Sequence, residues 1–220
     1  MSQKVHLKIS DATFQRFEEI RQKLNLKEKQ SLSSPLGTVL ADLTCEIIEQ
    51  VFGQLVSTSN STDHESSKLI QTVVETTRKY MPWSVSFLSN ERLTPMVNYL
   101  SGLMSHQNGQ HLLSYSVDST LITELLGCIE QLKQGNGQYR GPTLKAFTQV
   151  VDQGVTSLIR EPKKMLKFNM VVDKTLNGVI GVTTQLAYKR FDKLATIYDA
   201  QTLSQFFNHF MVFLDQQKKN

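Results

Sequence analysis

The sequence predicts an all-α protein, a multi-helix bundle of seven or eight helices with a short strand at its N-terminus. Apolar residues recur every three or four positions along most of the chain, as on the buried face of a helix. Capping residues or prolines stand where these stripes begin, and short polar segments separate them. The sequence contains no repeat of constant period, so we expect a packed bundle rather than a solenoid.

The N-terminal segment follows a period of two instead of the helical period. This alternation over residues 4–9 predicts a short strand, because successive side chains of a strand point to opposite faces. The apolar face consists of Val5, Leu7 and Ile9, and the polar face consists of Lys4, His6 and Lys8. We expect β structure nowhere else in the chain.

Prolines mark the expected ends of several helices. We expect Pro82 to stop one helix and Pro162 to separate two others, because proline lacks the N–H group that a helix interior needs. The pair Thr94–Pro95 is expected to begin a helix that ends at His106–Gly109.

One apolar stripe, from Met165 to Ile197, is about three times as long as an average helix. We expect it to break near Gly178 or Gly181, because a glycine lowers helix propensity by about 1 kcal/mol relative to alanine. The absence of a side chain at these glycines also predicts a close approach by a neighbouring helix.

The clearest linker is the small and polar segment of residues 57–63. It would divide the chain into an N-terminal strand and helix segment, residues 1–56, and a helical bundle, residues 64–220. The alternative is one single domain of residues 1–220, since this length is within the usual range of one domain.

The composition and the N-terminus indicate a cytoplasmic protein without a membrane span. The chain has 40% hydrophobic and 20% charged residues, as an ordinary globular protein does. Its two cysteines, Cys45 and Cys128, are too few for a disulfide framework, which fits a reducing compartment. No signal peptide and no apolar run of about 20 residues is evident.

No motif in the sequence predicts an enzyme. Asp42, Glu46 and Glu49 share one face of a predicted helix, but no histidine follows a glutamate by three positions, as helical metal-carboxylate centres require. We expect a solvated acidic face there instead. The chain has no Gly-x-Ser-x-Gly elbow, and both cysteines lie within apolar stripes. We therefore predict no catalytic residue, no metal and no cofactor.

The leading function hypothesis is a non-enzymatic interaction or regulatory protein, an adaptor that binds another protein or a second copy of itself. The last predicted helix has an unusually wide apolar arc, which either closes the core of the bundle or docks a partner. Aromatic side chains supply much of the binding energy at such surfaces. The candidate partner-binding residues are Phe206, Phe207, Phe210 and Phe213.

A second hypothesis is a DNA-binding regulator. The strand over residues 4–9 is followed by two predicted helices, and this order resembles that of the ribbon-helix-helix repressors. In that family paired strands enter the major groove of DNA. The resemblance covers about a quarter of the chain and implies DNA contacts by the outward side chains, which are Lys4, His6 and Lys8.

A third hypothesis is a carrier of an apolar ligand in a gap between helices. Stripes rich in methionine and phenylalanine, and the two glycines of the longest stripe, suggest it. Such sites are mostly apolar and have few polar groups.

Overall fold

The structure, a computed structural model, describes residues 2–58 and 64–214 of the chain. In chain order its elements are β1 (Ser2–Ile9), α1 (Asp11–Asn25), α2 (Ser33–Thr58), α3 (His64–Val85), α4 (Asn90–Gly102), β2 (Met104–Gln107), β3 (Gln110–Asp118), α5 (Ser119–Lys133), η1 (Gly137–Tyr139), α6 (Arg140–Val155), η2 (Thr156–Arg160), α7 (Glu161–Met165), α8 (Met170–Ile197), α9 (Ala200–Phe210) and η3 (Met211–Phe213).

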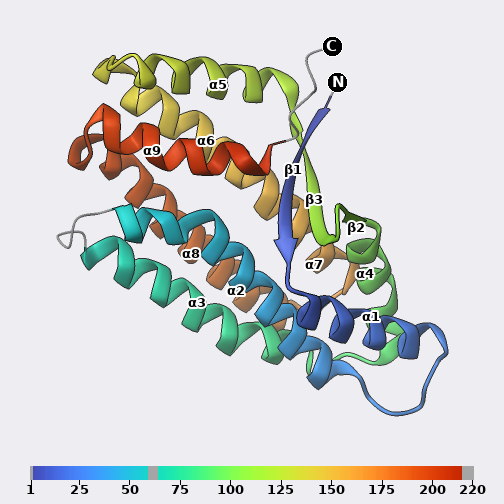
Figure 1. Cartoon of the computed structure of the whole chain (residues 1–220). Helices are drawn as coiled ribbons and strands as arrows, with labels where there is room; N and C mark the ends of the chain where they lie inside the picture. The colour runs from blue at the N-terminus through green and yellow to red at the C-terminus, as the bar shows by residue number, and fades with distance from the viewer. Residues whose placement is uncertain (1, 59–63, 215–220) are drawn as a thin grey trace.

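The predicted helical bundle is confirmed (Figure 1). Helices α5, α6 and α9 form one group, α2 and α3 run side by side in a second, and α8 lies behind α2. The predicted N-terminal strand is present as β1. Its apolar side chains Val5, Leu7 and Ile9 are buried, in agreement with the alternation in the sequence.

The sheet is larger than the sequence predicts. It has the order β1-β3-β2 with antiparallel pairing, and β1 pairs with β3 along its whole length, from Ser2 opposite Asp118 to Ile9 opposite His111. Figure 1 shows these two strands running from the group of α5, α6 and α9 toward α1 and α4. The sheet therefore joins the N-terminus to the middle of the chain.

The prediction that His106–Gly109 ends a helix is wrong, because these residues belong to a β-hairpin. Asn108 and Gly109 have φ angles of 51° and 73°, as in the tight turn that matches the twist of two antiparallel strands. The preceding helix, α4, ends at Gly102. The pair Asn-Gly followed by alternating apolar residues was the signal in the sequence for this hairpin.

Two prolines lie inside helices rather than at their ends. Helix α3 continues past Pro82 to Val85, and α4 begins at Asn90 and contains Pro95. Pro82 is near the end of α3, so its missing N–H group interrupts little of the helix. It packs against α2 at Gly37, where an added Cβ atom would lie 2.6 Å from the Cα atom of Pro82.

The expected break in the longest apolar stripe is also displaced. Helix α8 is continuous through Gly178 and Gly181, and the chain instead turns before it, at Lys167, which has a φ of 47°. A Cβ atom added at either glycine would meet nothing within 4 Å. The expectation of a close helix approach at these glycines is therefore wrong.

Residues from both sides of the predicted linker share one core. Of the linker itself, residues 57 and 58 end α2, and residues 59–63 lie outside the described part of the chain. The largest buried cluster combines Val5 and Val51 with side chains of α5, α6, α8 and α9 around Phe147. A second cluster joins α1, α2 and α4, and Leu43 lies in a small cluster between the two.

The contact between Gly37 and Pro82 gives a test of the α2–α3 packing. We expect Gly37→Ala to destabilise the protein by about 1–3 kcal/mol, because the new methyl group must push the two helix backbones apart. Gly53→Ala, in the same helix but with open space around it, is the control and should stabilise by up to about 1 kcal/mol. Urea denaturation measures both values, and equal effects of the two substitutions would contradict this packing.

Candidate ligand-binding site

An apolar hollow of about 280 Å³ lies between α2, α3, the α6–α7 segment and α8. Residues of β1 and β3 close it at the sheet, where Leu7, Leu113 and Tyr115 contribute to its wall. A smaller hollow of about 60 Å³ lies beside it and shares Phe52 and Val73 with it. Most of the surrounding side chains are aliphatic or aromatic, so the hollow has the character of a site for an apolar molecule.

Helix α3 is the loosely packed wall of this hollow. Of the side chains described from Glu65 to Trp83, none is buried, and Val73 in the middle of this range is half-buried. The apolar face of α3 therefore covers the hollow without filling it. Native cores are usually packed as densely as organic crystals, so incomplete filling over this length is unusual.

The wall formed by α6 and α7 contains a π turn, η2. In such a turn the carbonyl of residue i accepts from residue i+5, which makes the turn wider than an α-helical one. The donor for Ser157 would be residue 162, and Pro162 has no N–H group. The hydroxyl of Tyr99 donates to the Ser157 carbonyl instead, at 3.0 Å. The helix thus passes Pro162 without the break that the sequence predicts, and Leu158 and Pro162 face the hollow.

Tyr115 of β3 is a deeply buried residue of the wall that carries a hydroxyl group. It is 6% exposed, and its ring end lies against Gly154 of α6, where an added Cβ atom would be 2.8 Å from the ring carbon Cζ. Both residues line the hollow. The hydroxyl makes no hydrogen bond to any residue that the structure describes. Burial raises the pKa of the Tyr115 phenol, so this group stays protonated at neutral pH.

A second tyrosine of the wall, Tyr188, has partners for its hydroxyl. It donates to Asp152 Oδ1 at 2.7 Å, and Arg160 Nη1 lies 2.9 Å from the same oxygen. Burial and this hydrogen bond raise the pKa of Tyr188. Near the end of α7, Lys163 forms an ion pair with Asp173 of α8. These polar groups therefore form hydrogen bonds and ion pairs with one another at the wall.

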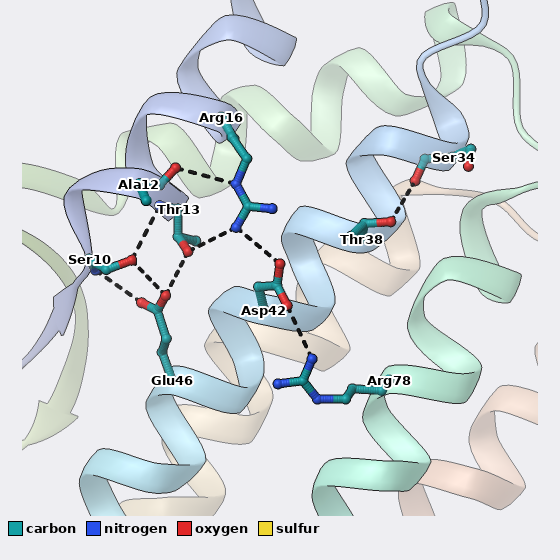
Figure 2. A network of polar contacts seen from close by, with 9 residues as sticks. All are labelled: Ser10, Ala12, Thr13, Arg16, Ser34, Thr38, Asp42, Glu46 and Arg78. Atoms are coloured by element: carbon teal, nitrogen blue, oxygen red, sulfur yellow. Dashed lines mark hydrogen bonds and ion pairs between the residues drawn. The ribbon is translucent and has the colours of Figure 1, made fainter.

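The carboxylates that the sequence places on one helix face lie elsewhere, where β1 turns into α1 (Figure 2). Glu46 accepts hydrogen bonds from the backbone N of Ser10 at 3.0 Å, from the Ser10 hydroxyl at 2.7 Å and from the Thr13 hydroxyl at 2.6 Å. Because Ser10 caps α1, this contact fixes the start of that helix on α2.

Asp42 lies one turn before Glu46, between two arginines. Figure 2 shows Arg16 of α1 and Arg78 of α3 pointing to it, at 3.0 and 3.4 Å. The expectation of a solvated acidic face is therefore wrong for Asp42 and Glu46, and only Glu49 of the three is exposed. No group of histidines, cysteines or acids suited to a metal ion occurs among the described residues.

The cysteines are not arranged as nucleophiles. Cys45 and Cys128 are buried, and burial raises the pKa of both thiols. A reactive cysteine needs the opposite shift, toward the thiolate. The hydrophobic setting that the sequence predicts for both residues agrees with this.

The four phenylalanines proposed as a partner surface lie inside the protein. They are between 0% and 5% exposed, and three of them pack directly on the ring of Phe147. They therefore offer no exposed surface to a second protein in this structure. The residues concerned are Phe206, Phe207, Phe210 and Phe213.

The three residues proposed for DNA contact lie on β1. Lys4 and Lys8 are exposed, and the Nδ1 atom of His6 lies 2.7 Å from the Ser114 hydroxyl of β3. One edge of β1 is fully paired with β3, and the other edge is contacted at Lys8 by Gln50 and at Val5 by a bridge to Leu214. This strand is therefore paired within the chain, unlike the strand pair that the ribbon-helix-helix resemblance implies.

Comparisons of the chain with protein-family models, with curated proteins and with solved structures give no match. The described helices include none with the length and apolar character needed to cross a membrane.

Neither Tyr115 nor the hollow was singled out in the sequence, although an apolar site between helices was one hypothesis. The alternation of Leu113, Tyr115 and Val117 after Asn108–Gly109 was the available signal for Tyr115. The hollow has no comparable signal, because the side chains that line a cavity and those that fill a core are of the same types.

Gly154 gives a test of the geometry at Tyr115. We expect Gly154→Ala to reduce the volume of the hollow and to lose the stabilisation that alanine usually gives within a helix, because the methyl group must displace the buried Tyr115 ring. The control Gly178→Ala, at an exposed helical position with open space, should stabilise by up to about 1 kcal/mol. Thermal unfolding compares the two variants. Equal stabilisation by both would contradict the close contact of Gly154 with Tyr115.

Proposed function

We propose that the protein binds an apolar small molecule in the hollow between α2, α3, the α6–α7 segment and α8. It would carry or sense this molecule rather than convert it. The observation that carries the proposal is the combination of volume and wall chemistry, about 280 Å³ surrounded mainly by aliphatic and aromatic side chains.

The volume is sufficient for a molecule of useful size. An engineered cavity of about 150 Å³ in another protein stays dry and binds benzene. At the same volume per carbon atom, the hollow would accommodate roughly a dozen carbon atoms. Such a ligand is the size of a bicyclic aromatic compound or of a medium-length alkyl chain.

An apolar molecule in the hollow would contact the aliphatic and aromatic side chains that line it. Dispersion contacts of this kind are individually small but collectively large, so they would favour binding.

The other two hypotheses have less support. The protein-binding hypothesis named the apolar arc of α9 as its candidate docking surface, and the phenylalanine rings of that arc pack in the core. The DNA-binding hypothesis depended on a strand free to pair with a second copy, and β1 pairs with β3 of the same chain. The hollow is a feature that internal packing does not explain.

Naphthalene, with its ten carbon atoms, is a suitable probe for the hollow. We expect the wild-type protein to bind it in sealed equilibrium dialysis with a stoichiometry of one. Val73→Phe places a larger side chain in the wall shared by the two hollows and should lower the affinity at least about tenfold, without lowering the melting temperature, because it fills empty space.

Gln71→Phe is the matched control, since it adds the same ring at an exposed position of the same helix. It should leave naphthalene binding unchanged. Absence of binding by the wild-type protein up to the solubility of naphthalene would contradict the proposed function. Equal binding by wild type and Val73→Phe would contradict the assignment to this hollow.

A further inference from the structure

Packing alone does not require the hydroxyl group of Tyr115. Its ring fills space between β3 and Gly154, which a phenylalanine would fill equally well. Its hydroxyl has no hydrogen-bond partner among the described residues, and the residue lies at the wall of the hollow. Tyr188, which also lines the hollow, has Asp152 as its partner. The unpaired hydroxyl of Tyr115 therefore needs an explanation of its own.

We infer that the Tyr115 hydroxyl forms a hydrogen bond with a single neutral oxygen, a hydroxyl or a carbonyl, of an otherwise apolar ligand. This inference rests on the proposed function and adds the chemical class of the ligand. Ligand sites of this type are mostly apolar, with a few polar groups that fix the orientation of the bound molecule. Tyr115 has the position for this role, because it lines the hollow and is almost fully buried.

The charges around the hollow favour a neutral group over an ionised one. Among the described residues that line the hollow, Lys163 is the only charged one, and Asp173 already pairs with it. Arg160, near the same wall, pairs with Asp152. A carboxylate or ammonium beside Tyr115 would lose its hydration without gaining an opposite charge, which is a large cost in an apolar site.

A phenolic hydroxyl also fits both neutral groups. It donates one hydrogen bond and accepts others, so it can donate to a ketone or ester carbonyl, or exchange a hydrogen bond with an alcohol or a phenol. Since the hollow would accommodate roughly a dozen carbon atoms, the ligand class is a small apolar alcohol, phenol or carbonyl compound.

The test compares 1-naphthol with naphthalene, which differ by one hydroxyl group, on the wild-type protein and on Tyr115→Phe. Sealed equilibrium dialysis at pH 7 gives the dissociation constant for each probe. We expect the preference for 1-naphthol over naphthalene to fall roughly three- to tenfold in Tyr115→Phe, the effect of losing one hydrogen bond. Naphthalene itself should bind the variant at least as tightly as the wild type.

Tyr188→Phe is the matched control, because it removes a hydroxyl from the same wall that already has a partner, and it should leave the preference unchanged. If both probes bind and Tyr115→Phe leaves the preference as it is, the role of Tyr115 is wrong while the proposed function stands. If neither probe binds the wild-type protein, the proposed function fails and this inference fails with it.

Discussion

The ring of Phe147 sets the spacing of the helices on which the rest of the structure depends. It lies on α6, at the centre of the largest buried cluster, and makes edge contacts with rings of three other helices. The ring centroids are 4.8 to 6.3 Å from that of Phe147, and the residues are Phe52, Phe191, Phe206, Phe207 and Phe210. These contacts hold α2, α8 and α9 around α6 at one end of the hollow.

Polar contacts hold the helices at the other end. The ion pair of Lys163 with Asp173 joins α7 to α8, and the hydrogen bond of Arg92 to the Leu166 carbonyl, at 2.6 Å, joins α4 to the end of α7.

Walls that are fixed at both ends cannot collapse onto the space between them. The π turn and Pro162 lie along this middle region, where Tyr99 supplies the donor that proline lacks. Helix α3 covers the same region with half-buried side chains such as Val73. The hollow is thus a consequence of how the helices are connected and held, and a preformed hollow costs little to reorganise when a ligand binds.

The sequence was sufficient for the parts of the fold that depend on local periodicity. It predicted the helical bundle and the alternation of β1, whose apolar side chains Val5, Leu7 and Ile9 are buried. It failed where distant residues decide the outcome. Pro162 remains inside a helix where Tyr99, far away in the sequence, donates to the carbonyl that proline cannot serve, and Pro82 packs against Gly37 of another helix. The carboxylates of α2 could not be assigned for the same reason, since their partners come from α1 and α3.

The most direct test of the central claim is the location of bound naphthalene by NMR, from nuclear Overhauser effects between its protons and assigned methyl groups. The account predicts contacts with Val73 of α3, Leu158 of η2 and Ile180 of α8, which lie on three walls of the hollow. Contacts confined to exposed methyl groups such as those of Leu26 and Val171, which lie outside the hollow, would contradict it.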